Sequence, residues 1–142
     1  MDIAKIKGLV EKHIDLILKT ERDLWKIPEA GYKEFKTDAY MKAAFRKLGY
    51  DLTEAEGITG FYTVVDTGKK GPTVLVLAEL DALYCADHPE CDKETKAVHA
   101  CGHNAQMAAI LGSLCLPFYI YTARAAVLTK ASITSLSSLL LP

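Results

Sequence analysis

Apolar side chains recur at three- and four-residue steps along residues 3–26. This period gathers them on one face of an amphipathic helix. Pro28 ends the helix, because the residue before a proline is driven out of helical backbone angles. We expect His13, which falls on the apolar stripe, to be a core histidine with its hydrogen bonds satisfied. The stripe consists of Ile3, Ile6, Val10, His13, Ile17 and Leu24.

A second helix is predicted after a short polar stretch. Thr37 can cap its start, and Gly49 can end it in a left-handed conformation. Pro28, Glu29 and Glu34, between the two helices, are typical of a helix stop followed by a turn. The buried face of the second helix would hold Met41, Ala44, Phe45 and Leu48.

Two strands are predicted next. Residues 61–66 are rich in aromatic and β-branched side chains. Residues 72–80 contain the uninterrupted apolar run 74–78, which is typical of a strand covered on both faces, with a buried helical segment as the alternative. Residues 82–98 are polar and predict a loop, and the alanine-rich residues 104–111 predict a helix. This order of elements indicates an α/β fold.

Composition narrows the class of protein. The chain has 142 residues, about the length of one domain, with half of them apolar and a quarter charged, which is typical of a globular protein. A net charge of −1 carries no basic surplus and argues against nucleic-acid binding. Four cysteines without an apolar leader at the start favour a reducing compartment, so we expect a cytoplasmic protein.

The composition changes along the chain. All 18 acidic residues lie between Asp2 and Glu94, and no histidine follows His103. We therefore expect two regions: residues 1–113, which carry the informative patterns, and residues 114–142, an atypical tail that is frameshifted, misjoined or disordered.

The segment His99-Ala100-Cys101-Gly102-His103-Asn104 has the strongest chemical pattern. If it is extended, His99, Cys101 and His103 point to one side and offer two imidazoles and a thiol. Zinc and similar divalent ions prefer these ligands. The alternative is a polar loop entering a helix, with one buried cysteine that acts as a small apolar side chain.

Two carboxylates follow the most apolar predicted strand. Glu79 and Asp81 stand at its carboxyl end, where α/β sheets gather their ligands. They could bind a metal ion or orient a histidine that does. A solvated strand end is the alternative. The cluster of Cys85, His88 and Cys91 has no fourth ligand nearby, and we expect a plain loop there.

Three segments resemble one family, in the family's order. Residues 24–34 resemble the N-terminal segment of the aminoacylase and carboxypeptidase-type metallopeptidases, which include amidohydrolases of N-acyl amino acids. Ala78-Glu79-Leu80-Asp81-Ala82-Leu83 resembles their DMDAL strand end, and residues 99–104 resemble their HACGHD metal segment. The resemblance covers about residues 2–113. It implies part of a mixed-sheet catalytic domain with a zinc-exopeptidase-like α/β fold, truncated in this chain.

The resemblance also implies roles for individual residues. Cys101 and His103 would be metal ligands, Glu79 a further ligand and Asp81 the residue that orients a ligand. The full-length family uses divalent metal, zinc or manganese, with two ions. The metal polarises the amide carbonyl of an N-acyl amino acid or dipeptide-like substrate and activates water, whose proton passes to a glutamate.

The chain departs from the family pattern in two ways. Asn104, Trp25 and Tyr84 stand where many relatives have Asp, His and Pro. Downstream of His103 there is no Glu, Asp or His to supply the base and the remaining ligands. We therefore expect little or no turnover from this chain alone, and homodimers only in full-length relatives, which have the dimerisation domain.

Two other functions are compatible with the sequence. The chain could be a non-catalytic metal-binding or interaction fragment. It could also span a membrane, because residues 105–123 are uncharged over about the length that a bilayer requires. Gln106, Gly112 and Pro117 interrupt that run, which argues against a membrane partner.

Overall fold

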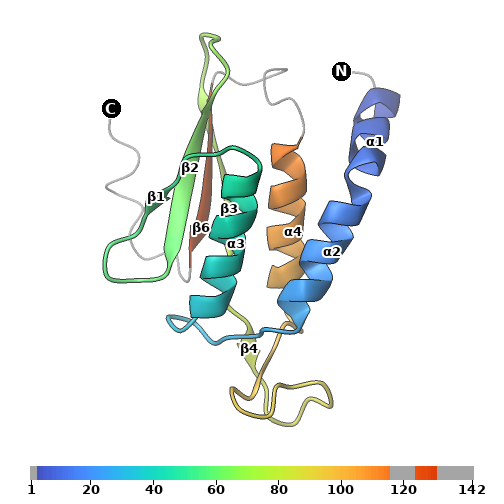
Figure 1. Ribbon diagram of the computed structural model, residues 1–142, viewed down its shortest axis with the longest axis vertical. Helices are drawn as coiled ribbons and strands as arrows, with labels where there is room; N and C mark the ends of the chain where they lie inside the picture. Colours follow the sequence, from blue (N-terminus) through green and yellow to red (C-terminus); the bar gives the residue numbers. More distant parts are fainter. Residues whose placement is uncertain (1–2, 116–123, 131–142) are drawn as a thin grey trace.

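The computed structural model describes residues 3–115 and 124–130. Its helices gather on one side of a sheet (Figure 1). They are α1 (Ile3–Lys12), α2 (Ile14–Trp25), α3 (Phe35–Lys47) and α4 (His103–Leu114). Within the described residues, no helix is both long enough and apolar enough to cross a bilayer.

The sheet mixes parallel and antiparallel pairing. Its order is β1-β2-β6-β3, and β6 pairs antiparallel with β2 and parallel with β3. These strands are β1 (Thr53–Glu54), β2 (Gly60–Asp66), β3 (Thr73–Glu79) and β6 (Arg124–Lys130). The α/β fold with a mixed sheet that the sequence predicts is therefore confirmed. The strand β6 comes from the region set apart by composition, and it lies between the two strands predicted from the sequence.

The first predicted helix is two helices. The helix is interrupted at His13. The N–H of His13 donates to the Val10 carbonyl at 3.0 Å in a tight turn before α2 begins. α1 buries none of its side chains. His13 is only half-buried, so the expected core position is wrong. The apolar stripe continues across residues 3–26, but only its second half is held in the core.

The core lies between the helices and the sheet. Phe45 of α3 packs edge-on against Phe61 of β2, with ring centroids 5.0 Å apart. On the other side of the core, α2 and α4 approach closely where Gly112 faces Ile17. A methyl group at Gly112 would lie 2.6 Å from the Ile17 side chain, so this glycine permits the contact.

The start of α3 is capped from a distance. The Glu29 carboxylate accepts hydrogen bonds from the backbone N–H groups of Lys36 and Thr37, at 3.1 and 2.9 Å. The Thr37 hydroxyl also donates to Glu29, at 3.1 Å. The prediction that Thr37 is the N-cap is therefore wrong, because α3 already begins at Phe35. Gly49 does have the predicted left-handed conformation, with φ of +89°.

The strand β3 is not covered on both faces. Val74 and Leu75 are 40% and 37% exposed, whereas Ala78 and Leu80 are fully buried. The prediction failed because the described helices cover one side of the sheet and because β3 is an edge strand among the described residues. The predicted loop also contains a short antiparallel pair, β4 (Leu83–Tyr84) and β5 (Ala97–Val98).

Candidate functional site

His103 lies between two carboxylates at the carboxyl end of β3. Its Nδ1 is 3.0 Å from Asp81 Oδ1, and its Nε2 is 3.0 Å from Glu79 Oε2. Nδ1 also lies 3.0 Å from the Asp81 carbonyl oxygen. The end of β3 and the start of α4 therefore bring together three of the four residues that the sequence singled out.

His103 contacts a carboxylate through each of its two ring nitrogens. A neutral imidazole carries one N–H and can donate to only one carboxylate. If Nδ1–H donates to Asp81, the lone pair of Nε2 faces a Glu79 oxygen that also only accepts. A cation bound between that nitrogen and the Glu79 oxygen would make the arrangement favourable. A carboxylate that orients one imidazole nitrogen while the other faces a cation is typical of metal-binding histidines.

The loop before α3 is hydrogen-bonded to the segment that follows Asp81. The Ala82 N–H donates to the Glu29 carbonyl at 2.7 Å, which ties the segment after Asp81 to that loop. A Cβ atom at Gly31 would lie 3.9 Å from Asp81 Oδ2 and 3.9 Å from Glu34 Oε1, so the backbone passes close to both carboxylates.

Glu34 is a buried carboxylate that sequence reasoning missed. It accepts a hydrogen bond from the Thr59 hydroxyl at 2.6 Å and another from the Tyr32 N–H at 2.7 Å. Tyr32 has a positive φ of 64°, which is uncommon for a residue with a side chain. The sequence predicts only a local turn at Glu29 and Glu34, because Thr37 and Thr59, which bond to them, are 8 and 25 residues away and leave no signal nearby in the sequence.

The segment 99–102 is a turn and not an extended run. The Gly102 N–H donates to the His99 carbonyl at 2.9 Å, and Gly102 has φ of +89°. The prediction that alternate side chains share one face is therefore wrong. His99 is 1% exposed, Cys101 is exposed and His103 is half-buried.

His99 has an unusual environment. Neither of its ring nitrogens has a hydrogen-bond partner within the described part of the chain. Burial, with a smaller contribution from the nearby His103, lowers the pKa of His99 from 6.5 to about 4, and Asp81 opposes the shift. The ring of His99 is therefore neutral near pH 7.

The site contains side chains of the types that bind metal ions, but too few of them lie together among the described residues to complete a metal site. Residues 3–115 and 124–130 contain no group of three or more His, Cys, Asp or Glu side chains arranged to hold an ion. His103 and Glu79 are two donors in contact. A catalytic zinc site generally has three protein ligands, so these two leave one position to fill.

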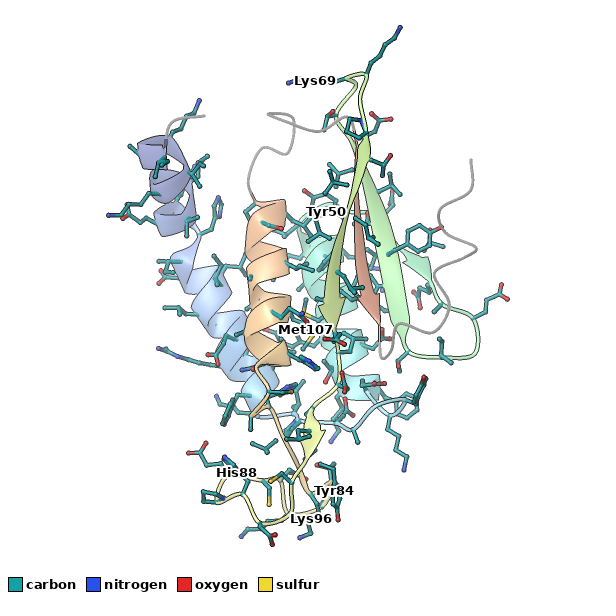
Figure 2. The ribbon with its side chains drawn as sticks, turned by 180° about the vertical axis from the view of Figure 1, so that it is seen from behind. Tyr50, Lys69, Tyr84, His88, Lys96 and Met107 are labelled. Atoms are coloured by element: carbon teal, nitrogen blue, oxygen red, sulfur yellow. The ribbon has the colours of Figure 1, made fainter. Side chains whose placement is uncertain are left out.

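The cluster of Cys85, His88 and Cys91 forms hydrogen bonds within its own loop. Cys85, His88 and Cys91 form successive turns by backbone hydrogen bonds of 3.1 and 3.0 Å, and the Cys91 thiol donates to the Ala86 carbonyl at 3.3 Å. Figure 2 shows His88 at the same end of the molecule as Lys96 and Tyr84, the last residue of β4. This arrangement fits the expected plain loop.

Asn104 has a structural partner on α2. Its side-chain amide donates to Glu21 Oε1 at 2.8 Å, and the side chain is buried. An aspartate at this position would place two carboxylates in contact. Asparagine, which stands at position 104 in place of the aspartate of the family motif, is therefore compatible with the neighbouring Glu21 because its amide can donate a hydrogen bond.

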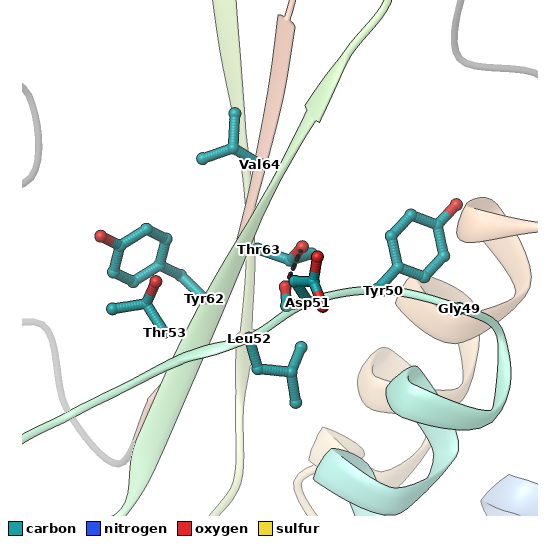
Figure 3. Close-up of a pocket in the computed structure, with 8 residues that line it drawn as sticks. All are labelled: Gly49, Tyr50, Asp51, Leu52, Thr53, Tyr62, Thr63 and Val64. Atoms are coloured by element: carbon teal, nitrogen blue, oxygen red, sulfur yellow. Dashed lines mark hydrogen bonds between the residues drawn. The ribbon is translucent and has the colours of Figure 1, made fainter.

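A separate hollow lies away from these residues. It has a volume of about 460 Å³ and is open to solvent between the loop after α3 and the strand β2 (Figure 3). The Thr63 hydroxyl donates to the Asp51 carbonyl at 2.7 Å in its wall. None of the predicted site residues lines it; its lining is Gly49, Tyr50, Asp51, Leu52, Thr53, Tyr62, Thr63 and Val64.

Several known proteins are similar to this chain, although no protein-family model matches it. "Thermostable carboxypeptidase 1" of Saccharolobus solfataricus is 32% identical over 114 residues, which are 78% of this chain and 29% of that protein. "N-acetyldiaminopimelate deacetylase" of Listeria innocua is 37% identical over 97 residues, which are 66% of this chain and 26% of that protein. The chain thus spans less than a third of the length of these relatives.

A solved structure shares the fold. The YXEP protein of Bacillus subtilis, described as a dinuclear metal-binding peptidase of the M20 family, superposes with a TM-score of 0.68 at 20% identity. The match covers 87% of this chain and 35% of that protein.

The arrangement of the elements and the similar structures define the class of protein. The fold is that of part of the α/β catalytic domain of metallopeptidases. The chain belongs to the M20 family of amidohydrolases and carboxypeptidases, and it corresponds to their N-terminal region. The family predicted from the sequence motifs is thereby confirmed.

Proposed function

We propose that this chain carries the first part of a metal-dependent site for the hydrolysis of amide bonds. Its substrates would be N-acyl amino acids or dipeptide-like molecules. Cys101, His103 and Glu79 would hold a divalent ion, zinc or manganese, with two ions in full-length relatives. Asp81 would orient His103. When bound, such an ion polarises the amide carbonyl and activates water.

The observation that carries the proposal is the position of His103. Asp81 fixes one nitrogen of its ring, and Glu79 faces the other at 3.0 Å. This arrangement favours a bound cation between His103 and Glu79, and His103 belongs to the segment that resembles the family's metal segment. Cys101 is exposed and two residues away, where a change in the turn could bring its thiol to the same ion.

Two acidic side chains near the site, Glu29 and Glu34, are already hydrogen-bonded. No acidic residue follows Glu94. We therefore propose that the chain alone binds metal and does not turn over substrate. A cytoplasmic location and homodimers of the full-length relatives belong to the same proposal.

Calorimetric titration with zinc and with manganese tests the metal site. We expect His103→Ala and Cys101→Ser each to weaken binding about 10- to 100-fold, because both remove a ligand. His88→Ala and Cys91→Ser are matched controls of the same residue types, and we expect them to leave the affinity unchanged. Equal loss in the controls, or no loss in either site variant, would contradict the assignment.

A non-catalytic metal-binding fragment is the second candidate function. His103 and Glu79 are in contact and have no third donor arranged with them among residues 3–115 and 124–130, which favours it. Hydrolysis assays with N-acetyl amino acids separate the two candidates. Metal binding without hydrolysis supports the fragment, whereas hydrolysis that is lost in His103→Ala supports an enzyme.

A further inference from the structure

Glu34 is a fully buried carboxylate, and its two oxygens accept hydrogen bonds from two different segments. Oε2 accepts from the Thr59 hydroxyl at 2.6 Å, and Oε1 accepts from the Tyr32 N–H at 2.7 Å. Tyr32 lies in the 30–33 turn, whose ends are joined by a backbone hydrogen bond of 3.0 Å. Its positive φ of 64° is costly for a residue with a side chain, and such a conformation persists only where surrounding contacts hold it. Glu34 supplies one of those contacts and fixes the turn to Thr59.

Thr59 lies at the end of the sheet that carries Asp81. The strands β2 and β3 are antiparallel to each other, because β6 pairs antiparallel with the first and parallel with the second. Gly60 and Glu79 both pair with Lys130, so the start of β2 and the end of β3 are in one row. Thr59 comes just before this row, and Asp81 comes just after it. The loop between α2 and α3 is at the same end of the molecule (Figure 1), so a bond from this loop to Thr59 also fixes the loop relative to the end of β3.

The 30–33 turn lies beside the Asp81 carboxylate. Oδ1 of Asp81 contacts His103 at 3.0 Å. Oδ2 is on the side of the turn, since a Cβ atom on Gly31 would lie 3.9 Å from it and 3.9 Å from Glu34 Oε1. The last torsion of an aspartate side chain has a broad energy minimum, so the neighbours of the two oxygens decide how the carboxylate is turned. The turn therefore limits the rotation of the Asp81 carboxylate on the side away from His103.

We propose that Glu34 is a positioning residue for this site: it holds the 30–33 turn beside Asp81, and Asp81 thereby keeps the proton of neutral His103 on Nδ1. The inference rests on the proposed function, because a proton on Nδ1 leaves the lone pair of Nε2 free for a cation. A neutral imidazole carries one N–H, and the hydrogen bond that one nitrogen makes decides which nitrogen can bind a metal ion. When the turn is released, His103 carries its proton on Nε2 more often, and that form does not bind a cation through Nε2.

Nitrogen-15 NMR of the His103 imidazole, in the full chain without metal, tests the proposal. The signals are assigned by comparison with His103→Ala. In alkaline solution, where imidazole rings are neutral, we expect the Nδ1–H form to predominate in the wild type. Glu34→Gln and Thr59→Val each remove the link between the turn and β2. We expect each to raise the ratio of the Nε2–H form to the Nδ1–H form by about threefold or more, which is the size of effect that one hydrogen bond has on an equilibrium. Thr59→Ser keeps the hydroxyl, and it should keep the wild-type ratio.

Calorimetric titration with zinc gives a second readout on the same variants. We expect Glu34→Gln and Thr59→Val to weaken zinc binding about 10-fold, the lower end of the effect of losing a residue that orients a metal-binding histidine. Thr63→Val is the matched control, because Thr63 is a buried threonine further along β2 whose hydroxyl donates to the Asp51 carbonyl. It should lower the melting temperature as Thr59→Val does, and it should leave both the ratio of the two His103 forms and the zinc affinity unchanged.

Three results would overturn the proposal: a wild-type His103 with its proton mainly on Nε2, a ratio that Glu34→Gln and Thr59→Val leave unchanged, or an equal shift in Thr63→Val, which would reflect a general loss of stability. Failure of the proposed function would look different, because the wild-type chain would then bind no zinc while the ratio still responded to Glu34→Gln. Circular dichroism confirms that each variant is folded. If Glu34→Gln does not fold, the comparison of Thr59→Val with Thr59→Ser and Thr63→Val decides the test.

Discussion

The two ends of β3 differ in burial and in the contacts of their side chains. At the carboxyl end, Ala78 and Leu80 are fully buried, and Glu79 and Asp81 contact His103. At the amino end, Val74 and the residues before it are exposed. Both ends belong to one apolar run, so hydrophobicity alone does not decide burial. The position of the helices decides it, because α4 begins beside the carboxyl end.

The largest difference between the two ends should be in stability. We expect Leu80→Ala to lower the free energy of unfolding by about 2–5 kcal/mol, because it leaves a cavity in the core. Leu75→Ala, on the same run, should cost less than about 1 kcal/mol, because its side chain already contacts water. Urea denaturation of both variants checks the comparison, and equal costs would show that the two ends are equally buried.

A substitution at Asn104 tests whether the hydrogen bond between Asn104 and Glu21 stabilises the start of α4. We expect Asn104→Asp to destabilise the chain by about 2–4 kcal/mol, since it puts a buried carboxylate against that of Glu21. The double variant Asn104→Asp with Glu21→Gln restores a donor, and it should recover most of the loss. Thermal or chemical denaturation of the cycle measures the coupling. Independent, additive effects would argue against the contact.

The close contact between α2 and α4 can be tested by adding a methyl group at Gly112. Gly112→Ala should destabilise by about 1–3 kcal/mol, because the added methyl group meets Ile17. Gly8→Ala is the matched control on α1, where no atom lies within 4 Å of the new methyl group. It should be neutral or stabilising by up to about 1 kcal/mol. The prediction fails if both substitutions stabilise.

The smallest effect concerns the buried carboxylate behind the site. Thr59→Val keeps the shape of the side chain and removes the hydroxyl that donates to Glu34. We expect a loss of about 1–2 kcal/mol in the free energy of unfolding, because the carboxylate loses a buried partner. Thr53→Val, on the exposed strand β1, serves as the control and should have little effect.

Local patterns in the sequence predicted the elements that depend on local interactions. The strand over Phe61–Asp66 and the helix after Gly102 were confirmed, since period and composition identify them. The chemical motifs also predicted which segments meet: the end of β3 and the start of α4 both carry polar side chains beside an apolar run. His103, Glu79 and Asp81 are therefore neighbours in the fold.

Features that depend on distant residues were not predictable in the same way. The strand β6 enters between β2 and β3, and no local pattern specifies its neighbours. The cap of α3 comes from Glu29, in the loop before the helix. The turn at residues 99–102 depends on Gly102 in a left-handed conformation, which separated the three side chains that simple alternation would have put together.

Zinc K-edge X-ray absorption of the zinc-loaded chain tests the proposed ligands most directly. The account predicts one sulfur neighbour at about 2.3 Å, with nitrogen and oxygen neighbours at about 2.0–2.2 Å. Cys101→Ser should remove the sulfur signal, and Cys91→Ser should keep it. A spectrum with two sulfur neighbours, or one that Cys101→Ser leaves unchanged, would contradict the assignment of Cys101, His103 and Glu79.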